Sequence, residues 1–140
     1  MDRATFDDYI RRFNAQDTTA FEDYLAPDMH MLNGSLEYTG VQGMKDHYAK
    51  IWGTFTERLN VLRFVSDDST IAIRMRADFE AFRDDEDSPF GPVARGTTFE
   101  SNCVIMYQVA DGRFADICVA HTSFVMRTPD GLSMDLGIPH

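Results

Sequence analysis

The chain has 140 residues, enough for one domain with a sizeable core. Apolar residues make up 44% of it and charged residues 26%, as in a soluble globular protein, and the formal net charge of −10 argues against nucleic acid or an anionic membrane as a partner. The first residues have no apolar signal core and no stretch approaches a membrane span, so we expect a cytoplasmic protein.

Helical spacing of apolar residues dominates the first half of the chain. The predicted elements are a helix from Phe6 capped by Thr5, a short helix that ends before Pro27, a strand over 29–32, a turn at Asn33-Gly34, and a third helix over 41–55 that begins after Gly40. Tyr9 lies on the apolar stripe of the first helix, and Tyr48 lies on that of the third.

Alternation of apolar and polar residues dominates the second half and predicts strands. These strands cover 59–65, 70–82, 95–109 and 113–127. Helices followed by strands indicate an α+β domain, with one curved antiparallel sheet and helices on one of its faces. We expect a single domain over 1–140, with its core at about 5–126 and a tail at 127–140.

The turn Asp111-Gly112 predicts the register of the last two strands, because Asp-Gly between alternating runs is a strong hairpin signal. A two-residue loop pairs Ala110 with Arg113. The pairs that follow are His121 with Asn102, Ser123 with Glu100, Val119 with Val104, and Ile117 with Met106. All eight side chains would then share one face, apolar near the turn and polar at its far end, as in the floor of a binding cavity. In the alternative interpretation, His121 and Glu100 lie at a wet sheet edge.

Several segments resemble the nuclear-transport-factor-2-like superfamily, in the group of SnoaL-like polyketide cyclases, ketosteroid isomerases and scytalone dehydratases. The segments are 9–17, 25–31, Gly40 before a helix, and the terminal hairpin. The resemblance covers about residues 5 to 126. It implies a cone-shaped, barrel-like domain in which the sheet and three helices enclose a deep pocket, usually in a homo-oligomer.

The resemblance to ketosteroid isomerase also suggests roles for individual positions. Tyr9 falls on the oxyanion-binding tyrosine, and Tyr48 on the tyrosine that hydrogen-bonds it. The carboxylate base falls on Asn33, the protonated aspartate falls on Val104, and His121 falls on a pocket-lining aromatic position. Because the base and the acid partner are absent, the resemblance implies that the chain is not a steroid isomerase of that mechanism.

The candidate catalytic residues are His121, Tyr9 and Glu100. A histidine titrates near neutrality and can accept and return a proton. The Tyr9 phenol can donate a hydrogen bond to an oxyanion, and Glu100 can orient the imidazole or act as a base. The other expected cavity residues are Asn33, Tyr48, Asn102, Val104, Met106, Ile117, Val119 and Ser123. The alternative is that Tyr9 and Tyr48 are core tyrosines whose hydroxyls are satisfied by backbone or water.

The remaining polar residues point away from metal or cofactor chemistry. No His, Cys, Asp or Glu pair has zinc-ligand spacing, and no glycine-rich loop follows a strand, so we expect no metal and no cofactor. Limonene-epoxide hydrolases in this superfamily use an Arg-x-Asp pair, but alternation places Arg76 and Asp78 on the other face. His30 and His47 are expected at edges. Cys103 and Cys118 are expected opposite the His121 face, free or bridged.

Two classes of function remain. The first is a cofactor-independent lyase, isomerase or cyclase that uses acid/base chemistry on a small hydrophobic aromatic molecule with hydroxyl or carbonyl oxygens. Members of the similar group include terpenoid isomerases, polyketide cyclases and lyases that release formaldehyde from lignin-derived diarylpropanes. The second is a non-catalytic small-molecule-binding or assembly module on the same fold. The expected partners are a small-molecule substrate and further copies of the chain, as a dimer or trimer, with no nucleic acid and no membrane.

Overall fold

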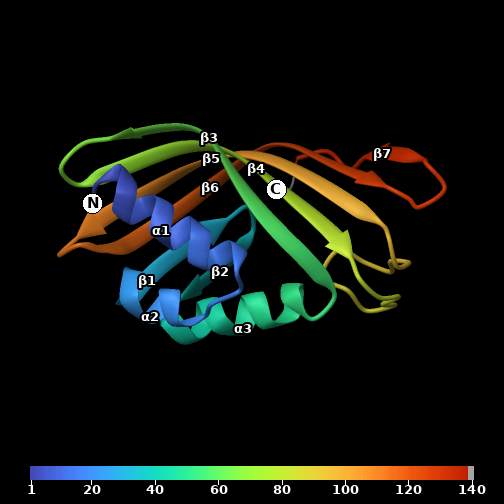
Figure 1. Ribbon diagram of the computed structural model, residues 1–140, viewed down its shortest axis with the longest axis horizontal. Helices are drawn as coiled ribbons and strands as arrows, with labels where there is room; N and C mark the ends of the chain where they lie inside the picture. The colour runs from blue at the N-terminus through green and yellow to red at the C-terminus, as the bar shows by residue number, and fades with distance from the viewer. Residues whose placement is uncertain (139–140) are drawn as a thin grey trace.

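The computed structural model describes residues 1–138. Figure 1 shows its elements, which are α1 (Arg3–Asn14), α2 (Thr19–Tyr24), β1 (Leu25–Asn33), β2 (Leu36–Thr39), α3 (Gly40–Trp52), β3 (Phe55–Ser66), β4 (Thr70–Ala81), β5 (Thr98–Ala110), β6 (Arg113–Arg127) and β7 (Ser133–Asp135). In this part of the chain, none of the helices has the length and apolarity needed to cross a bilayer.

The seven strands form one curved sheet that is not closed into a barrel. Its order is β2-β1-β6-β5-β4-β3, and β7 pairs with β6. The four long strands β3 to β6 are antiparallel, as their alternation predicted. However, β1 runs parallel to β6, so the prediction of a wholly antiparallel sheet is wrong at this pair. Because β1 enters the sheet from a helix and not from a hairpin, its sequence carried no information about its direction.

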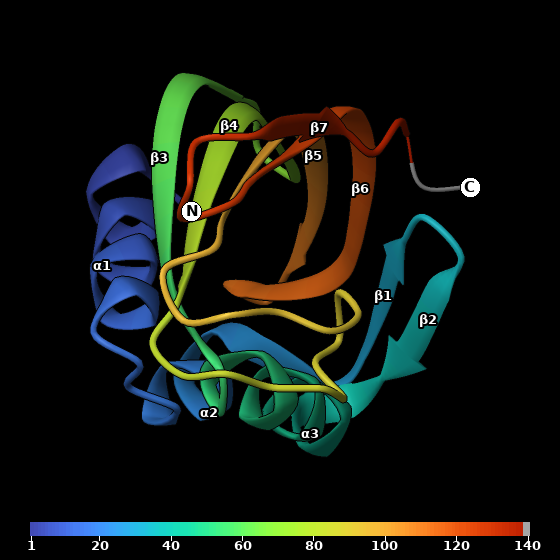
Figure 2. The ribbon, with the colours of Figure 1, turned by 90° about the vertical axis from the view of Figure 1, so that its right-hand side faces the viewer.

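The three helices lie against the concave side of the sheet and complete the cone-shaped α+β domain (Figure 2). Helix α1 lies beside β3, while α2 and α3 close the lower end. The predicted apolar stripe of α1 is buried and contains Phe6, Tyr9, Ile10 and Phe13. The helix begins earlier than expected: the side chain of Asp2, not Thr5, caps it by accepting the Thr5 N–H at 2.8 Å.

Two unpredicted strands and the end of α3 are the main differences from the sequence prediction. Strand β2 was not expected, nor was β7 in the predicted tail. Both are short and mostly exposed, so neither contains the alternation that identifies longer strands. Helix α3 ends at Trp52, and Phe55, expected in its last turn, instead begins β3 with its side chain fully buried.

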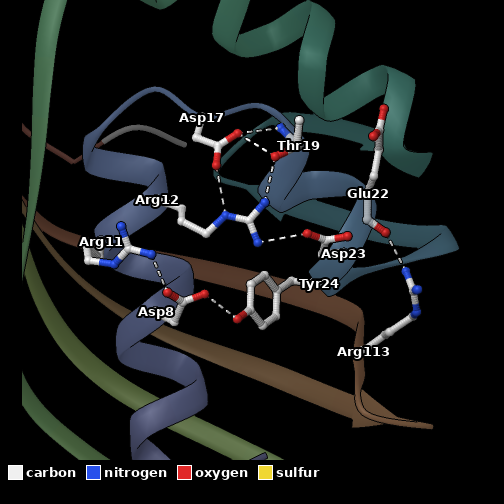
Figure 3. A network of polar contacts seen from close by, with 9 residues as sticks. All are labelled: Asp8, Arg11, Arg12, Asp17, Thr19, Glu22, Asp23, Tyr24 and Arg113. Atoms are coloured by element: carbon white, nitrogen blue, oxygen red, sulfur yellow. Dashed lines mark hydrogen bonds and ion pairs between the residues drawn. The ribbon is translucent and has the colours of Figure 1, made fainter.

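A network around Arg12 fastens α1 to α2 at the base of the cone (Figure 3). The guanidinium donates to Asp17 at 2.9 Å and to Asp23 at 2.8 Å. Next to it, the hydroxyl of Tyr24 donates to Asp8 at 2.7 Å. The Arg12 side chain is only 16% exposed, so its stem also fills space between the helices. The ion pair of Arg12 with Asp23 thereby connects α1, the helix that carries Tyr9, to α2.

Gly40, the first residue of α3, has a left-handed backbone conformation and lies close to the backbone of Pro27. Its φ is +78°, and an added Cβ would lie 3.1 Å from the carbonyl oxygen of Pro27. Gly40→Ala should lower the free energy of unfolding by about 2–3 kcal/mol, from left-handed strain plus this contact. The matched control is Gly112→Ala, where φ is +74° and no atom lies within 4 Å. It should cost about 1 kcal/mol. Equal losses in urea unfolding would show that the close approach to Pro27 is unimportant.

Candidate active site

Two β-bulges set the register of the terminal hairpin and decide which side chains face inward. Ala110 pairs with Arg113, as the Asp-Gly turn predicted. The register then shifts between Gln108 and Val109, and again between Asn102 and Cys103. As a result His121 pairs with Cys103, and not with Asn102 as expected. A shift of one residue moves every side chain of one strand to the opposite face relative to the other strand.

The prediction for the β5 side of the site is therefore wrong. Of the expected cavity residues, Glu100, Asn102, Val104 and Met106 alternate onto the outer face of the sheet, and Ser123 joins them beyond the second bulge. Val104 and Met106 are 43% and 53% exposed. The amide of Asn102 donates to Ser123 at 3.1 Å and to Glu100 at 3.2 Å. Glu100 also lies 3.6 Å from Arg127, so it neither orients His121 nor faces the cavity.

A cavity of about 80 Å³ lies between the concave face of the sheet and helices α1 and α3. Six of the expected residues line it, namely Tyr9, Asn33, Tyr48, Ile117, Val119 and His121. The lining side chains that were not expected in the cavity include Glu57, Ser101, Cys103 and Tyr107. Met31, Met44 and Met75 form much of the apolar wall. Because methionine side chains are flexible, this wall can widen around a ligand.

His121 has a protein partner at each ring nitrogen. Its Nε2 lies 2.5 Å from Asn33 Oδ1, and its Nδ1 lies 3.1 Å from Ser101 Oγ. The amide oxygen can only accept, so Nε2 donates and Nδ1 accepts the Ser101 hydroxyl. Burial lowers the pKa of the imidazole below its ordinary value of 6.5. His121 is therefore neutral at pH 7 and carries its lone pair on Nδ1.

Glu57 is the titratable residue that the sequence analysis missed. It lies on β3, is 8% exposed, and lines the same cavity. Burial raises the pKa of its carboxyl to about 8, and the hydrogen bond that Trp52 Nε1 donates at 3.1 Å only partly opposes this. The carboxyl is therefore protonated at neutral pH. Extending the alternation of Leu59 two residues upstream would have placed Glu57 on the inner face, but the strand was expected to begin at Leu59.

Three tyrosine hydroxyls add hydrogen-bond donors to the cavity. They belong to Tyr9, Tyr48 and Tyr107, and burial raises the pKa of each phenol above its ordinary value of 10, so they remain protonated. No side-chain nitrogen or oxygen among the described residues is both sealed from the solvent and without a partner. The predicted hydrogen bond between Tyr9 and Tyr48 is absent. Instead the Phe13 ring packs against both, with ring centroids 6.3 Å and 4.8 Å away.

Both cysteines are free thiols and lie on opposite faces of the sheet. Cys103 is buried and lines the cavity, and burial raises the pKa of its thiol to about 11. Cys118 is exposed and pairs with Met106 on the outer face. The expectation that both lie opposite His121 is therefore wrong for Cys103. The bulge at Gln108 and Val109 shifts β5 by one residue relative to β6, so Cys103 pairs with His121 on the cavity face.

The other candidate groups lie outside the cavity. Arg76 and Asp78 form an exposed ion pair at 3.2 Å on the outer face, as alternation predicted. The side chain of His30 bonds Asp116 and Glu37 at 2.7 Å each. The ring of His47 on α3 packs against that of Tyr48, with centroids 4.8 Å apart, and against that of Tyr38 on the edge strand β2. Within residues 1–138, no three His, Cys, Asp or Glu side chains are grouped as metal ligands.

Comparisons with known proteins place this geometry in a family. The SnoaL-like domain family matches residues 6–117. A protein from Xanthomonas campestris pv. campestris, provisionally described as a polyketide cyclase, shares 19% identity with a TM-score of 0.71, covering 83% of this chain and 86% of its own. One from Pseudomonas putida KT2440, described in the same way, shares 22% identity with a TM-score of 0.69, covering 82% and 86%.

An LEH-like epoxide hydrolase from M. tuberculosis shares 10% identity with a TM-score of 0.66, and the match covers 84% of this chain and 80% of the other. No curated protein matches the chain in sequence. At these identities the structural likenesses show a common fold and do not establish a common reaction.

Proposed function

Because the chain belongs to the SnoaL-like domain family, we propose that it is a cofactor-independent lyase or isomerase that acts by acid/base chemistry. Its substrate is a small, hydrophobic, aromatic molecule with a hydroxyl or carbonyl oxygen. One observation carries the proposal: the carboxyl of Glu57, whose pKa is raised by burial, and the imidazole of His121, whose pKa is lowered by burial, line the same apolar cavity. Titratable groups whose environments shift their pKa values in opposite directions are typical of acid/base sites.

The protonation states assign the roles. Glu57 has a pKa of about 8 and donates its proton to a substrate oxygen at pH 7. His121 is neutral and accepts a proton from substrate carbon or oxygen at Nδ1, after the substrate displaces the Ser101 hydroxyl. The Tyr9 phenol donates a further hydrogen bond to the oxygen on which charge develops. Proton transfer and charge stabilisation then need only side chains of this chain.

The lining of the cavity favours an uncharged substrate. Its two ionisable residues nearest neutrality, Glu57 and His121, are both uncharged at pH 7, and methionine and aromatic side chains surround them. A charged ligand would lose its hydration without gaining an opposite charge, which is costly. Ring-containing substrates such as lignin-derived diarylpropanes, polyketides or terpenoids fit this chemistry, provided that Met31, Met44 and Met75 move to enlarge the cavity.

We also propose that the protein is a cytoplasmic homo-oligomer, a dimer or trimer. The exposed apolar residues of the outer sheet face, Val104 and Met106, support an interface there. Two free thiols, one of them exposed, suit a reducing compartment. Size-exclusion chromatography with light scattering measures the oligomeric state directly.

The test of function is hydrogen–deuterium exchange into phenylacetone and 2-tetralone, two neutral aryl ketones, followed by NMR in deuterated buffer. Exchange next to the carbonyl requires a base for the carbon and a donor for the oxygen, and no other reactant. We expect the wild-type protein to exchange these protons faster than an equal concentration of free imidazole. Ketones that shift the signals of cavity residues but exchange only at the buffer rate would favour the alternative, a non-catalytic binding module.

Tyr9→Phe tests the proposed hydrogen bond to the substrate oxygen. Removing one donor from a pre-organised site should lower the exchange rate by about 10- to 1000-fold. The melting temperature should change little, because the Tyr9 hydroxyl faces the cavity and the ring remains. Tyr24→Phe is the matched control, since its hydroxyl bonds Asp8 outside the cavity and its loss should leave the rate unchanged. Equal rates for Tyr9→Phe and wild type would remove Tyr9 from the mechanism.

A further inference from the structure

Three polar side chains form a line across the adjacent strands β5, β6 and β1 on the cavity face. Ser101 Oγ lies 3.1 Å from His121 Nδ1, and His121 Nε2 lies 2.5 Å from Asn33 Oδ1. Ser101 is 4% exposed, and all three residues line the cavity. The acid/base function proposed above makes no use of the Ser101 hydroxyl, since there the substrate simply displaces it.

The direction of the hydrogen bonds allows His121 to accept the proton of the Ser101 hydroxyl. Asn33 Oδ1 can only accept, so the imidazole proton lies on Nε2 and the lone pair of Nδ1 points at the Ser101 hydroxyl. A hydroxyl within hydrogen-bond reach of a base, which is itself oriented by a third group, is the arrangement that activates a serine nucleophile. The orienting group here is an amide, as it also is in cysteine–histidine–asparagine sites.

A β-bulge creates this line. The pairs Asn102 with Ser123 and Cys103 with His121 leave Thr122 as the extra residue of β6. Without it, His121 and Phe124 could not both face inward, because side chains alternate along a regular strand. The Thr122 hydroxyl donates to the carbonyl of Asn102 at 3.2 Å and thereby holds the bulge. Bulges next to active sites often re-aim a side chain in this way.

We propose that Ser101 is a nucleophile, activated by His121 and positioned through Asn33, and that the chain transfers acyl groups from small uncharged esters to water. This is a second activity in the same cavity and does not rest on the lyase or isomerase function. The apolar, uncharged lining selects neutral esters.

The reaction balances with water as the only co-reactant. Ser101 Oγ forms a bond to the ester carbonyl carbon while its proton passes to His121 Nδ1. The bond to the leaving alcohol then breaks, and the alcohol takes that proton from His121. Water attacks the acyl-serine with His121 as base, which releases the acid and restores the hydroxyl. The donor to the oxyanion is the Glu57 carboxyl, which lines the same cavity as Ser101.

The experiment uses p-nitrophenyl acetate as the probe, with the protein in a Cys118→Ser background because the exposed thiol would react by itself. We expect a burst of p-nitrophenol and a protein mass increased by one acetyl group, located by peptide mapping on Ser101. Ser101→Ala and His121→Gln should each lower the acylation rate by about 100-fold or more. Ser123→Ala, which changes a serine on the outer face, is the matched control and should acylate like the parent.

Acetylation found only on lysine or Cys103, at the same rate in Ser101→Ala, would overturn the nucleophile. Thermal unfolding of each variant shows whether a lost burst reflects a lost fold, and His121→Gln gives a second test that leaves Ser101 in place. The outcome also separates the two activities. A protein that exchanges ketone protons but forms no acyl-Ser101 lacks only the nucleophile, whereas one that acylates without exchange lacks only the lyase or isomerase function.

Discussion

Glu57→Gln should lower the rate of ketone proton exchange by about 10²- to 10⁴-fold, the usual contribution of a general acid. The amide keeps the shape of the side chain and can still accept the hydrogen bond from Trp52 Nε1, but it has no acidic proton. Because the carboxyl is protonated up to a pH of about 8, the wild-type rate should also decline above that pH. NMR-detected exchange between pH 6 and pH 9, on wild type and variant, measures both effects.

The matched control is Glu100→Gln. Sequence reasoning placed Glu100 in the site, whereas the structure places it on the outer face beside Arg127. Its substitution should leave the exchange rate unchanged. If Glu100→Gln lost activity and Glu57→Gln kept it, both the register of the hairpin and the role of Glu57 would be contradicted.

His121→Ala should lower the same rate by about 10²- to 10⁴-fold, since it removes the base. Burial lowers the pKa of His121, so the neutral and active form persists below pH 6.5 and the rate should fall only when the pH drops further. The exchange rate should therefore show a plateau that extends from below pH 6.5 to about pH 8. The decline of the exchange rate at low pH should be absent from His121→Ala.

His30→Ala serves as the control for this substitution. Its imidazole bonds two carboxylates, and these hydrogen bonds raise its pKa, but it does not line the cavity. Loss of its contacts with Asp116 and Glu37 can affect stability but should leave the rate per folded molecule unchanged. An unaltered rate in His121→Ala, with an intact fold, would remove His121 from the chemistry.

The sequence predicted the fold well because its elements are long and strongly periodic. The apolar stripe of α1 and the alternation of β4 are examples in which local pattern and burial agree. The resemblance to a known family supplied the cone shape, and it also supplied the positions of Tyr9, Asn33 and Tyr48, which all line the cavity. The short strands β2 and β7 carry too little pattern to be found from sequence.

The candidate site could be predicted only in part, because it depends on register. Sequence analysis identified His121 but gave it the wrong neighbours, since neither β-bulge has a glycine or another residue that marks it. Cys103 was therefore assigned to the outer face, Glu100 and Asn102 were assigned to the inner one, and Ser101 was not singled out. Glu57 was missed because its raised pKa is caused by burial. The burial of a glutamate on a strand depends on three-dimensional packing, which the local sequence does not show.

The raised pKa of Glu57 is the central claim, and an NMR titration of its side-chain carboxyl carbon tests it most directly. We predict a midpoint at about pH 8, which Glu57→Gln removes from the spectrum. Since the ordinary value is 4.5, the folded state would bind the extra proton between these two pH values, and stability would decline as the pH rises from about 4.5 to about 8. A midpoint near 4.5 would mean that the cavity holds a carboxylate at neutral pH, and it would contradict the proposed acid.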